Sequence, residues 1–272
     1  MNSIKKMMLS GALGCLISGM AYADGSSPQP VKPYWQDIQV VAVNKEKPRS
    51  SFMSYADRET ALTSRFEKSP YYSLLNGTWK FFFVDSYKDL PQNITDPSVN
   101  TSSWDDITVP GNWEVQGHGV AIYTNHGYEF KPRNPQPPLL PEANPVGVYR
   151  RDIEIPASWD NRDIYLHIGG AKSGLYVYLN GKEVGYSEDS KNPAEFLINK
   201  YLQPGKNVLT LKIFRWSTGS YLECQDFWRM SGIERDVFLW SQPKASIQDF
   251  RVVSTLDLSL IHISEPTRRS YI

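Results

Sequence analysis

The fold class of this chain is indicated most directly by the stretch Leu175-Tyr-Val-Tyr-Leu-Asn-Gly-Lys-Glu-Val-Gly185. Leu175, Val177 and Leu179 alternate with two tyrosines, which is the period of two expected when one face of a strand points into a core. Asn180-Gly181 follows directly, and this pair favours a two-residue hairpin turn because both turn positions require a positive φ. The stretch therefore predicts two antiparallel strands joined by a tight turn.

Similar strand-like segments, separated by turn residues, recur on both sides of this hairpin. An aromatic strand is expected at 79–84 after the Asn76-Gly77 turn, and residues 194–201 are expected to form a single helical turn. Without amphipathic helices of about ten to fifteen residues, the pattern predicts an all-β sandwich or jelly roll. The remaining alternating faces comprise Tyr149, Arg151, Ile153 and Ile155; Ile164, Leu166 and Ile168; Leu209, Leu211 and Ile213; and Arg235, Val237 and Leu239.

The composition fits a globular domain with a proper core. Of the 272 residues, 40% are apolar and 13% are aromatic, and this length allows one large β domain or one and a half ordinary ones. The 29 basic residues balance the 29 acidic residues. Because no clustered basic surface is indicated, we expect no nucleic-acid partner.

Residues 1–23 have the three parts of a secretory signal peptide. Lys5-Lys6 gives the positive start, residues 7–20 are an apolar stretch too short to span a bilayer, and Ala21-Tyr22-Ala23 gives the cleavage pattern. Cleavage after Ala23 predicts a secreted or periplasmic protein without a membrane span; the alternative is a lipoprotein attached through Cys15. Without the leader, Cys224 is the one cysteine in the sequence, so no intrachain disulfide is expected.

The densest cluster of aromatic and charged residues is the run Arg215-Trp-Ser-Thr-Gly-Ser-Tyr-Leu-Glu-Cys-Gln-Asp-Phe-Trp-Arg-Met-Ser-Gly-Ile-Glu-Arg-Asp-Val237, called the signature run below. A loop that docks on another domain, or shapes a sugar pocket, would carry such bulky aromatics. The run resembles a signature stretch of the β-galactosidases of glycoside hydrolase family 2, within their N-terminal sugar-binding domain. Two uses of its side chains stay open, stacking on sugar or contact with a catalytic barrel, and both involve Trp216, Tyr221, Trp228 and Arg229.

The resemblance covers residues 35–257 and implies a domain order. Residues 24–60 would be a Pro-rich linker and an extended N-terminal arm, and 61–242 a galactose-binding-like jelly roll that binds sugar. Residues 243–257 would be the first strand of a truncated immunoglobulin-like domain, with Ile247, Phe250 and Val252 as its apolar positions. Residues 258–272 depart from the family pattern and resemble translated sequencing-adapter DNA, so we expect them to be an artefact.

The resemblance also implies two residues that contact sugar. Pro110-Gly-Asn-Trp113 and Ile122-Tyr-Thr-Asn125 match the family stretch whose Asn reaches into the sugar pocket, which assigns that role to Asn125. Gly185-Tyr-Ser-Glu-Asp-Ser190 matches the loop whose Asp contacts galactose and helps to hold a sodium ion, which assigns both roles to Asp189. The family's magnesium ligands would not lie on this chain. From the residues alone, Asn125 would stabilise its loop and Asp189 would cap a turn.

The chain itself is expected to carry no catalytic residue. Retaining glycosidases need two carboxyl groups about 5–5.5 Å apart. Glu188 and Asp189 are adjacent and would point to opposite faces of a strand, whereas Glu223 and Asp226 could converge if their loop turns helically. The family's own catalytic motifs are absent from the sequence. The sequence shows no Gly-rich phosphate loop. It also offers no zinc-like spacing among His118, His126, His167 and His262.

The expected parent is therefore a secreted β-galactosidase that hydrolyses terminal non-reducing β-D-galactose with retention. Its expected partners are the β-galactoside, the missing catalytic barrel and further copies of itself in a homo-oligomer. The fragment alone would be inactive. Alternatives are another family 2 glycosidase, acting on β-glucuronides or β-mannosides, and a carbohydrate-binding module without an enzyme.

Overall fold

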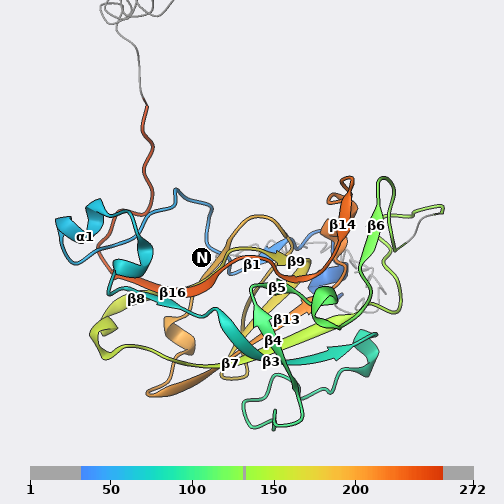
Figure 1. Cartoon of the computed structure of the whole chain (residues 1–272), viewed down its shortest axis with the longest axis horizontal. Helices are drawn as coiled ribbons and strands as arrows, with labels where there is room; N and C mark the ends of the chain where they lie inside the picture. The colour runs from blue at the N-terminus through green and yellow to red at the C-terminus, as the bar shows by residue number, and fades with distance from the viewer. Residues whose placement is uncertain (1–31, 131–132, 254–272) are drawn as a thin grey trace, which may run out of the picture. The chain divides into compact units, whose positions relative to one another are not determined.

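The computed structural model describes residues 32–130 and 133–253 (Figure 1). The leader at 1–23 with its alternative at Cys15, and the artefact at 258–272, lie outside the described residues. All described secondary structure lies within the unit Pro33–Ile272.

Two antiparallel sheets form the body of this unit. The larger has the strand order β1-β11-β10-β13-β7-β3-β4 and the smaller β12-β8-β16-β2. The strands of the larger sheet are β1 (Ala42–Val43), β3 (Gly77–Val84), β4 (Asp105–Val109), β7 (Val146–Glu154), β10 (Gly174–Leu179), β11 (Lys182–Ser187) and β13 (Lys206–Phe214). The strands of the smaller sheet are β2 (Tyr72–Leu74), β8 (Arg162–Ile168), β12 (Ala194–Leu197) and β16 (Val237–Pro243).

Two smaller sheets are added to the sandwich. β6 (Ile122–Thr124) pairs with β14 (Phe227–Arg229) as a two-stranded ribbon, which projects from the body in Figure 1. β15 (Gly232–Ile233) lies between β5 (Gly111–Asn112) and β9 (Ala171–Lys172). Both small sheets contain a strand of the signature run.

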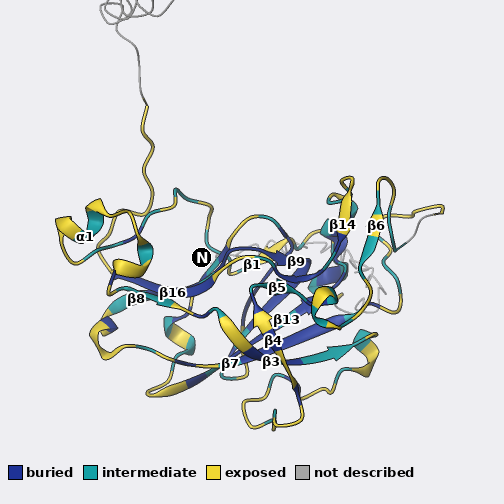
Figure 2. Cartoon of the chain, viewed as in Figure 1, coloured by how far each residue is buried: buried dark blue, intermediate teal, exposed yellow. Residues whose placement is uncertain are grey.

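The main core lies between the two large sheets, where the strands are coloured as buried in Figure 2. The expected faces of β10 and β8 are confirmed: Leu175, Val177 and Leu179 meet Ile164 and Leu166 in one apolar cluster. In the face predicted for Arg235, Val237 and Leu239, Arg235 is wrong, because it is exposed and precedes β16. Leu179 pairs with Lys182, and Asn180 and Gly181 have φ values of 54° and 77°. The hairpin therefore has the two-residue turn that its sequence predicts.

The outer face of the larger sheet is also covered. Tyr176 and Tyr186 are buried there beneath the N-terminal arm, whose Trp35 is 1% exposed and stacks on Phe214 at 4.9 Å. Aromatic burial of this size stabilises a sheet face strongly. The arm is thus part of the folded domain from residue 33 onward.

Helices are short and peripheral. The one α-helix of the described residues, α1 (Arg58–Leu62), begins at Asp57, whose carboxylate accepts the N–H of Thr60 at 2.8 Å. No helix in the described ranges is both long and apolar enough to cross a membrane. The 3-10 turns are η1 (Tyr34–Gln36), η2 (Phe66–Lys68), η3 (Tyr87–Asp89), η4 (Glu114–Gln116), η5 (Ala157–Trp159), η6 (Asn199–Tyr201) and η7 (Thr218–Tyr221).

Two predicted elements are wrong. Residues 194–197 form strand β12 on the edge of the smaller sheet, and a helical turn occupies η6 alone. Ala194 and Phe196 alternate as buried residues, so pairing with β8 overrides the weak local preference. Residues 244–253 contain no strand, since no strand among the described residues pairs with them, and Ile247 and Val252 are exposed. The assignment of that segment to an immunoglobulin-like domain stays a prediction.

A glycine in the central strand β7 makes room for a buried tryptophan. A Cβ atom on Gly147 would lie 2.5 Å from two ring atoms of Trp113 and 2.7 Å from Phe81. Trp113 is 0% exposed and its backbone N–H donates to Ser231 of the signature run at 3.0 Å. The glycine thus determines how closely the Pro110–Trp113 motif approaches the sheet.

We expect Gly147→Ala to lower the free energy of unfolding by about 1–3 kcal/mol, because the added methyl overpacks the core. Urea denaturation measures the change. In the double variant with Trp113→Leu, the smaller side chain should relieve the clash, so the double variant should lose less stability than the two single losses added together. Simple additivity would show that the two residues are not in steric contact.

Candidate functional site

Asp189 lies on a loop, residues 188–193, that connects β11 to β12. Its two neighbours are buried: Glu188 is 3% exposed and Ser190 is 0% exposed. Asp189 itself is exposed. Of three adjacent polar residues, the outer two are therefore buried and the middle one, Asp189, faces solvent.

Glu188 points inward and is held by three donors. Its carboxylate accepts the hydroxyl of Tyr186 at 2.7 Å and the N–H of Gly219 at 2.7 Å. The Thr218 hydroxyl lies 3.0 and 2.9 Å from the two carboxylate oxygens. Burial raises the pKa of Glu188, and these donors oppose the rise only in part.

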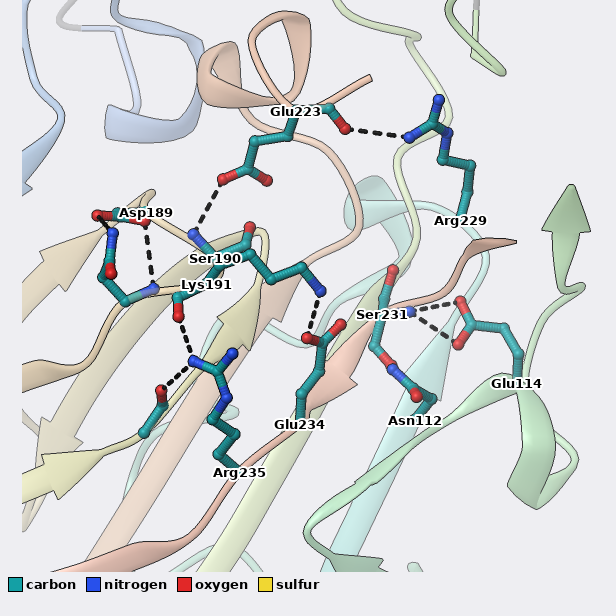
Figure 3. A network of polar contacts seen from close by, with 12 residues as sticks. Asn112, Glu114, Asp189, Ser190, Lys191, Glu223, Arg229, Ser231, Glu234 and Arg235 are labelled. Carbon is teal, nitrogen blue, oxygen red and sulfur yellow. Dashed lines mark hydrogen bonds and ion pairs between the residues drawn. The ribbon is translucent and has the colours of Figure 1, made fainter. Parts of the chain in front are cut away.

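The rest of the loop is tied to the signature run as well (Figure 3). The N–H of Ser190 donates to the Glu223 carboxylate at 3.0 Å. Lys191 makes an ion pair with Glu234, and its carbonyl accepts from the Arg235 guanidinium. Residues of the signature run therefore contact the loop on both sides of Asp189.

Asp189 accepts hydrogen bonds from Asn192. The side-chain amide donates at 2.9 Å and the backbone N–H lies at 3.4 Å. This is the turn-capping geometry that the residues alone indicate. Because Asp189 is exposed, its carboxylate keeps acceptor capacity, and its sugar and sodium roles stay predictions.

The fit of this loop to a sodium ion is partial. Asp189 offers hard carboxylate oxygens of the kind such a cation takes. However, the described residues contain no group of three or more His, Cys, Asp or Glu side chains placed to hold a metal ion. Asp189 is thus the one charged ligand that the prediction assigns to sodium, and no described residue is assigned to magnesium.

Asn125 follows the end of β6 and is exposed. Its side-chain oxygen lies 2.6 Å from Nδ1 of His126, and the Thr124 hydroxyl donates to the His126 carbonyl at 2.6 Å. No hydrogen bond among the described residues joins Asn125 to Asp189. The two predicted sugar contacts are nevertheless linked indirectly, since β14 of the signature run pairs with β6 and Glu223 of the same run binds Ser190.

Two buried ion pairs fix the path of the signature run. Arg215 lies 3.7 Å from Glu114, and Arg229 lies 3.6 Å from Glu129; all four side chains are at most 5% exposed. Burial raises the pKa of Glu114 and lowers the pKa of Arg215, so desolvation outweighs attraction across that gap. Backbone contacts compensate, because Glu114 accepts the N–H of Ser231 at 2.8 Å and Arg215 donates to the Val120 carbonyl at 2.8 Å.

The four conspicuous side chains of the run have different surroundings. Tyr221 is half-buried, its hydroxyl donates to the Leu139 carbonyl, and its ring meets those of Tyr128 and Phe130 edge-on. Arg229 is 1% exposed and cannot stack on an open sugar, and Trp216 is half-buried with its indole N–H donating to Glu129 at 3.0 Å. Trp228 is 50% exposed and meets the ring of Tyr123 edge-on across the ribbon. Of these, Trp228 is the side chain available to a ligand or a partner.

The two members of each candidate carboxylate pair have different surroundings. Glu188 is buried while Asp189 is exposed. Glu223 accepts from Ser190, and Asp226 accepts the hydroxyl of Tyr123 at 2.7 Å. Glu188, Glu223 and Asp226 are therefore engaged in contacts within the fold.

A charged hub that sequence reasoning missed holds the N-terminal arm. Glu195 accepts from Arg49 at 3.0 Å and from the Trp240 indole at 3.0 Å, and lies 2.8 Å from Nδ1 of His167. The Arg49 guanidinium also lies over Trp240 at 4.4 Å. Arm and sheet enclose a pocket of about 340 Å³ that Asp189 also lines. No local sequence motif predicts this hub, because its members are far apart in the sequence.

The fold and these loops define an antiparallel β-sandwich of the kind that presents binding residues from its loops. Residues 72–243 match the family described as "Glycosyl hydrolases family 2, sugar binding domain", and the chain belongs to that family.

Relatives and solved structures agree with this assignment. The chain is similar to proteins named "Beta-galactosidase" from Priestia megaterium, with 41% identity over 83% of this chain and 22% of that protein, and from Psychromonas ingrahamii, with 39% identity over 84% and 22%. The chain thus spans about a fifth of the length of these curated relatives. A solved β-glucuronidase of an uncultured Clostridium sp. shares the fold, with a TM-score of 0.50 and 23% identity over 69% of this chain and 31% of that chain.

Glu188 and Glu195 should respond to pH in opposite directions. Burial raises the pKa of Glu195, but His167 and Arg49 outweigh burial and hold it below the usual range. A depressed carboxyl pKa contributes stability above about pH 4.3 that is lost as the pH falls through the folded-state value. A raised one, as at Glu188, costs stability as the pH rises above about 4.3.

We therefore expect Glu195→Gln to lower the free energy of unfolding at neutral pH, with a deficit that shrinks in acid. Glu188→Gln should gain stability relative to the parent chain as the pH rises, because the parent must ionise a buried carboxylate. Urea unfolding at a series of pH values between about 3 and 8 measures both slopes. A variant whose curve runs parallel to that of the parent would contradict the charge state assigned to that glutamate.

Proposed function

We propose that this chain supplies the sugar-binding domain of an exported β-galactosidase, and that the complete protein hydrolyses terminal non-reducing β-D-galactose residues with retention. The proposal for the substrate rests on the relatives of about 40% identity that carry this name. The export proposal rests on the leader pattern at 1–23.

The observation that carries the proposal is the display of Asp189. It is an exposed carboxylate on a loop whose Glu188, Ser190 and Lys191 are bound by the signature run. A carboxylate accepts hydrogen bonds from sugar hydroxyls, and a neutral amide such as Asn125 both donates and accepts. Asp189 and Asn125 would therefore recognise the galactosyl group, and Asp189 would supply one oxygen ligand to sodium.

Chemistry is assigned to the remainder of the complete protein. Retention requires a nucleophile and an acid/base about 5–5.5 Å apart, whereas Glu188, Glu223 and Asp226 are each committed to structural hydrogen bonds. The catalytic barrel and the magnesium ligands would belong to that remainder. The exposed Trp228 would contact the barrel, and the complete protein would form a homo-oligomer.

The chain on its own is expected to show no turnover of an aryl β-galactoside, because Glu188, Glu223 and Asp226 of the two candidate pairs are engaged in hydrogen bonds within the fold. The assay compares the repurified chain with its Glu223→Gln variant and includes an aryl β-glucuronide. Persistent galactoside turnover that Glu223→Gln abolishes would place the catalytic carboxylate on this chain and contradict the proposal. Turnover of the glucuronide by the complete protein, in place of the galactoside, would favour the alternative family 2 activity.

In the complete protein, Asp189→Ala should weaken sugar recognition and sodium activation together, whereas Asn125→Ala should affect the sugar alone. Losing a hydrogen bond to a charged group costs about 1.5–3 kcal/mol and losing a neutral one about 0.5–1.5 kcal/mol. These costs correspond to a loss of about ten- to a hundredfold in kcat/KM for Asp189→Ala and about tenfold or less for Asn125→Ala. The measurement is kcat/KM as a function of sodium concentration. If Asp189→Ala keeps the sodium dependence of the parent, the sodium assignment is wrong and Asp189 is only a turn-capping residue.

A further inference from the structure

The loop that displays Asp189 is locked by a buried carboxylate next to it. We infer that Glu188 is a positioning residue for sugar recognition: its inward carboxylate joins β11 and the η7 turn, so that Asp189 is presented in one orientation. This inference rests on the proposed role of Asp189.

The contacts of Glu188 explain why it locks the loop. Its donors come from two separate segments: Tyr186 lies in β11, whereas Thr218 and Gly219 lie in η7. No cation contributes a hydrogen bond or ion pair to it among the residues that the structure describes. A buried carboxylate without a cation depends on all of its hydrogen bonds, so any movement of the loop away from η7 would leave it unsatisfied.

The η7 side of the contact is built for close approach. A Cβ atom on Gly219 would lie 3.1 Å from Oε2 of Glu188 and 3.4 Å from its Cβ. Glycine therefore lets the backbone N–H reach the carboxylate at 2.7 Å. Ser217 and Ser220 form a capping box that holds the turn itself, since the N–H of Ser217 donates to the Ser220 hydroxyl at 3.1 Å.

The backbone on both sides of Asp189 is fixed as a result. The N–H of Glu188 donates to the Val41 carbonyl at 3.1 Å, and the N–H of Ser190 donates to Glu223 at 3.0 Å. Rotation of the Asp189 side chain is the main freedom that remains at this position. An acceptor held in place before binding loses less conformational entropy when a ligand arrives.

The first test uses the whole 272-residue chain and measures amide hydrogen exchange by NMR. Glu188→Ala should speed exchange at Ser190 and Gly219 by about tenfold or more relative to the remainder of the domain. Glu188→Gln should keep the protection, because its amide oxygen can accept from Gly219 while its NH₂ group donates to the Tyr186 hydroxyl. Unchanged protection in Glu188→Ala would overturn the inference.

Glu114→Ala is the matched control for general loosening of the signature run. Glu114 is also a buried carboxylate that accepts a backbone N–H of the run, from Ser231, but none of its hydrogen bonds reaches residues 188–193. Its loss should lower global stability without a local change at Ser190 and Gly219. If Glu114→Ala exposes these two amides as strongly as Glu188→Ala does, the lock is not specific to Glu188 and the inference fails.

Kinetics of the complete protein then connect the lock to recognition. Glu188→Ala should reduce kcat/KM for an aryl β-galactoside by about 10- to 100-fold, and Glu188→Gln should restore most of it. An equal loss in both variants, or no loss in either, would overturn a positioning role. If the unaltered complete protein does not cleave the galactoside, the proposed function fails, whereas the exchange result still decides whether Glu188 locks the loop.

Discussion

Two buried arginines constrain the region from which this domain presents its candidate site. Arg215 and Arg229 are at most 5% exposed and face buried glutamates across 3.7 and 3.6 Å. At these distances the charges attract without an ideal hydrogen bond, so the pairs are weak sources of net stability. Removal of one partner would nevertheless leave an uncompensated buried charge, which is strongly destabilising. The main effect of the two ion pairs is therefore to hold the signature run in one conformation, and their net contribution to the stability of the fold is small.

The path of the signature run connects it to both candidate binding elements, the ribbon that ends at Asn125 and the loop of Asp189. The run pairs through β14 with the ribbon that ends at Asn125, and through Glu223, Glu234 and η7 it holds the loop of Asp189. A displacement of the run would consequently move both elements. The density of charged and aromatic residues in the run thus has a physical reason: its side chains are used for internal contacts first, and Trp228 and Phe227 are its large aromatic side chains that remain substantially exposed.

Local patterns predict the strands and the hairpin, because alternation and the Asn180-Gly181 turn act over a few residues. Partner-dependent features escape them. Strand β12 forms because β8 offers a free edge, while residues 244–253 with a similar pattern pair with no strand of the described chain. The site shows the same limit. The resemblance selects Asp189 for the sugar contact, but it does not show what the adjacent Glu188 does. Two neighbouring carboxylates look equivalent in a sequence, whereas in the folded chain burial gives Glu188 a separate, structural role.

This separation also supports the proposal that the domain recognises sugar while the chemistry belongs to the remainder of the complete protein. A catalytic pair needs two carboxyl groups that face one reacting bond. Glu188, Glu114 and Glu223 instead each accept a backbone N–H from elsewhere in the fold, and Glu195 is occupied by Arg49 and Trp240. A carboxylate that accepts backbone N–H groups within the fold is not free to face a reacting bond. Asp189, held by one neighbouring Asn and open to solvent, can bind a ligand without dismantling the loop that carries it.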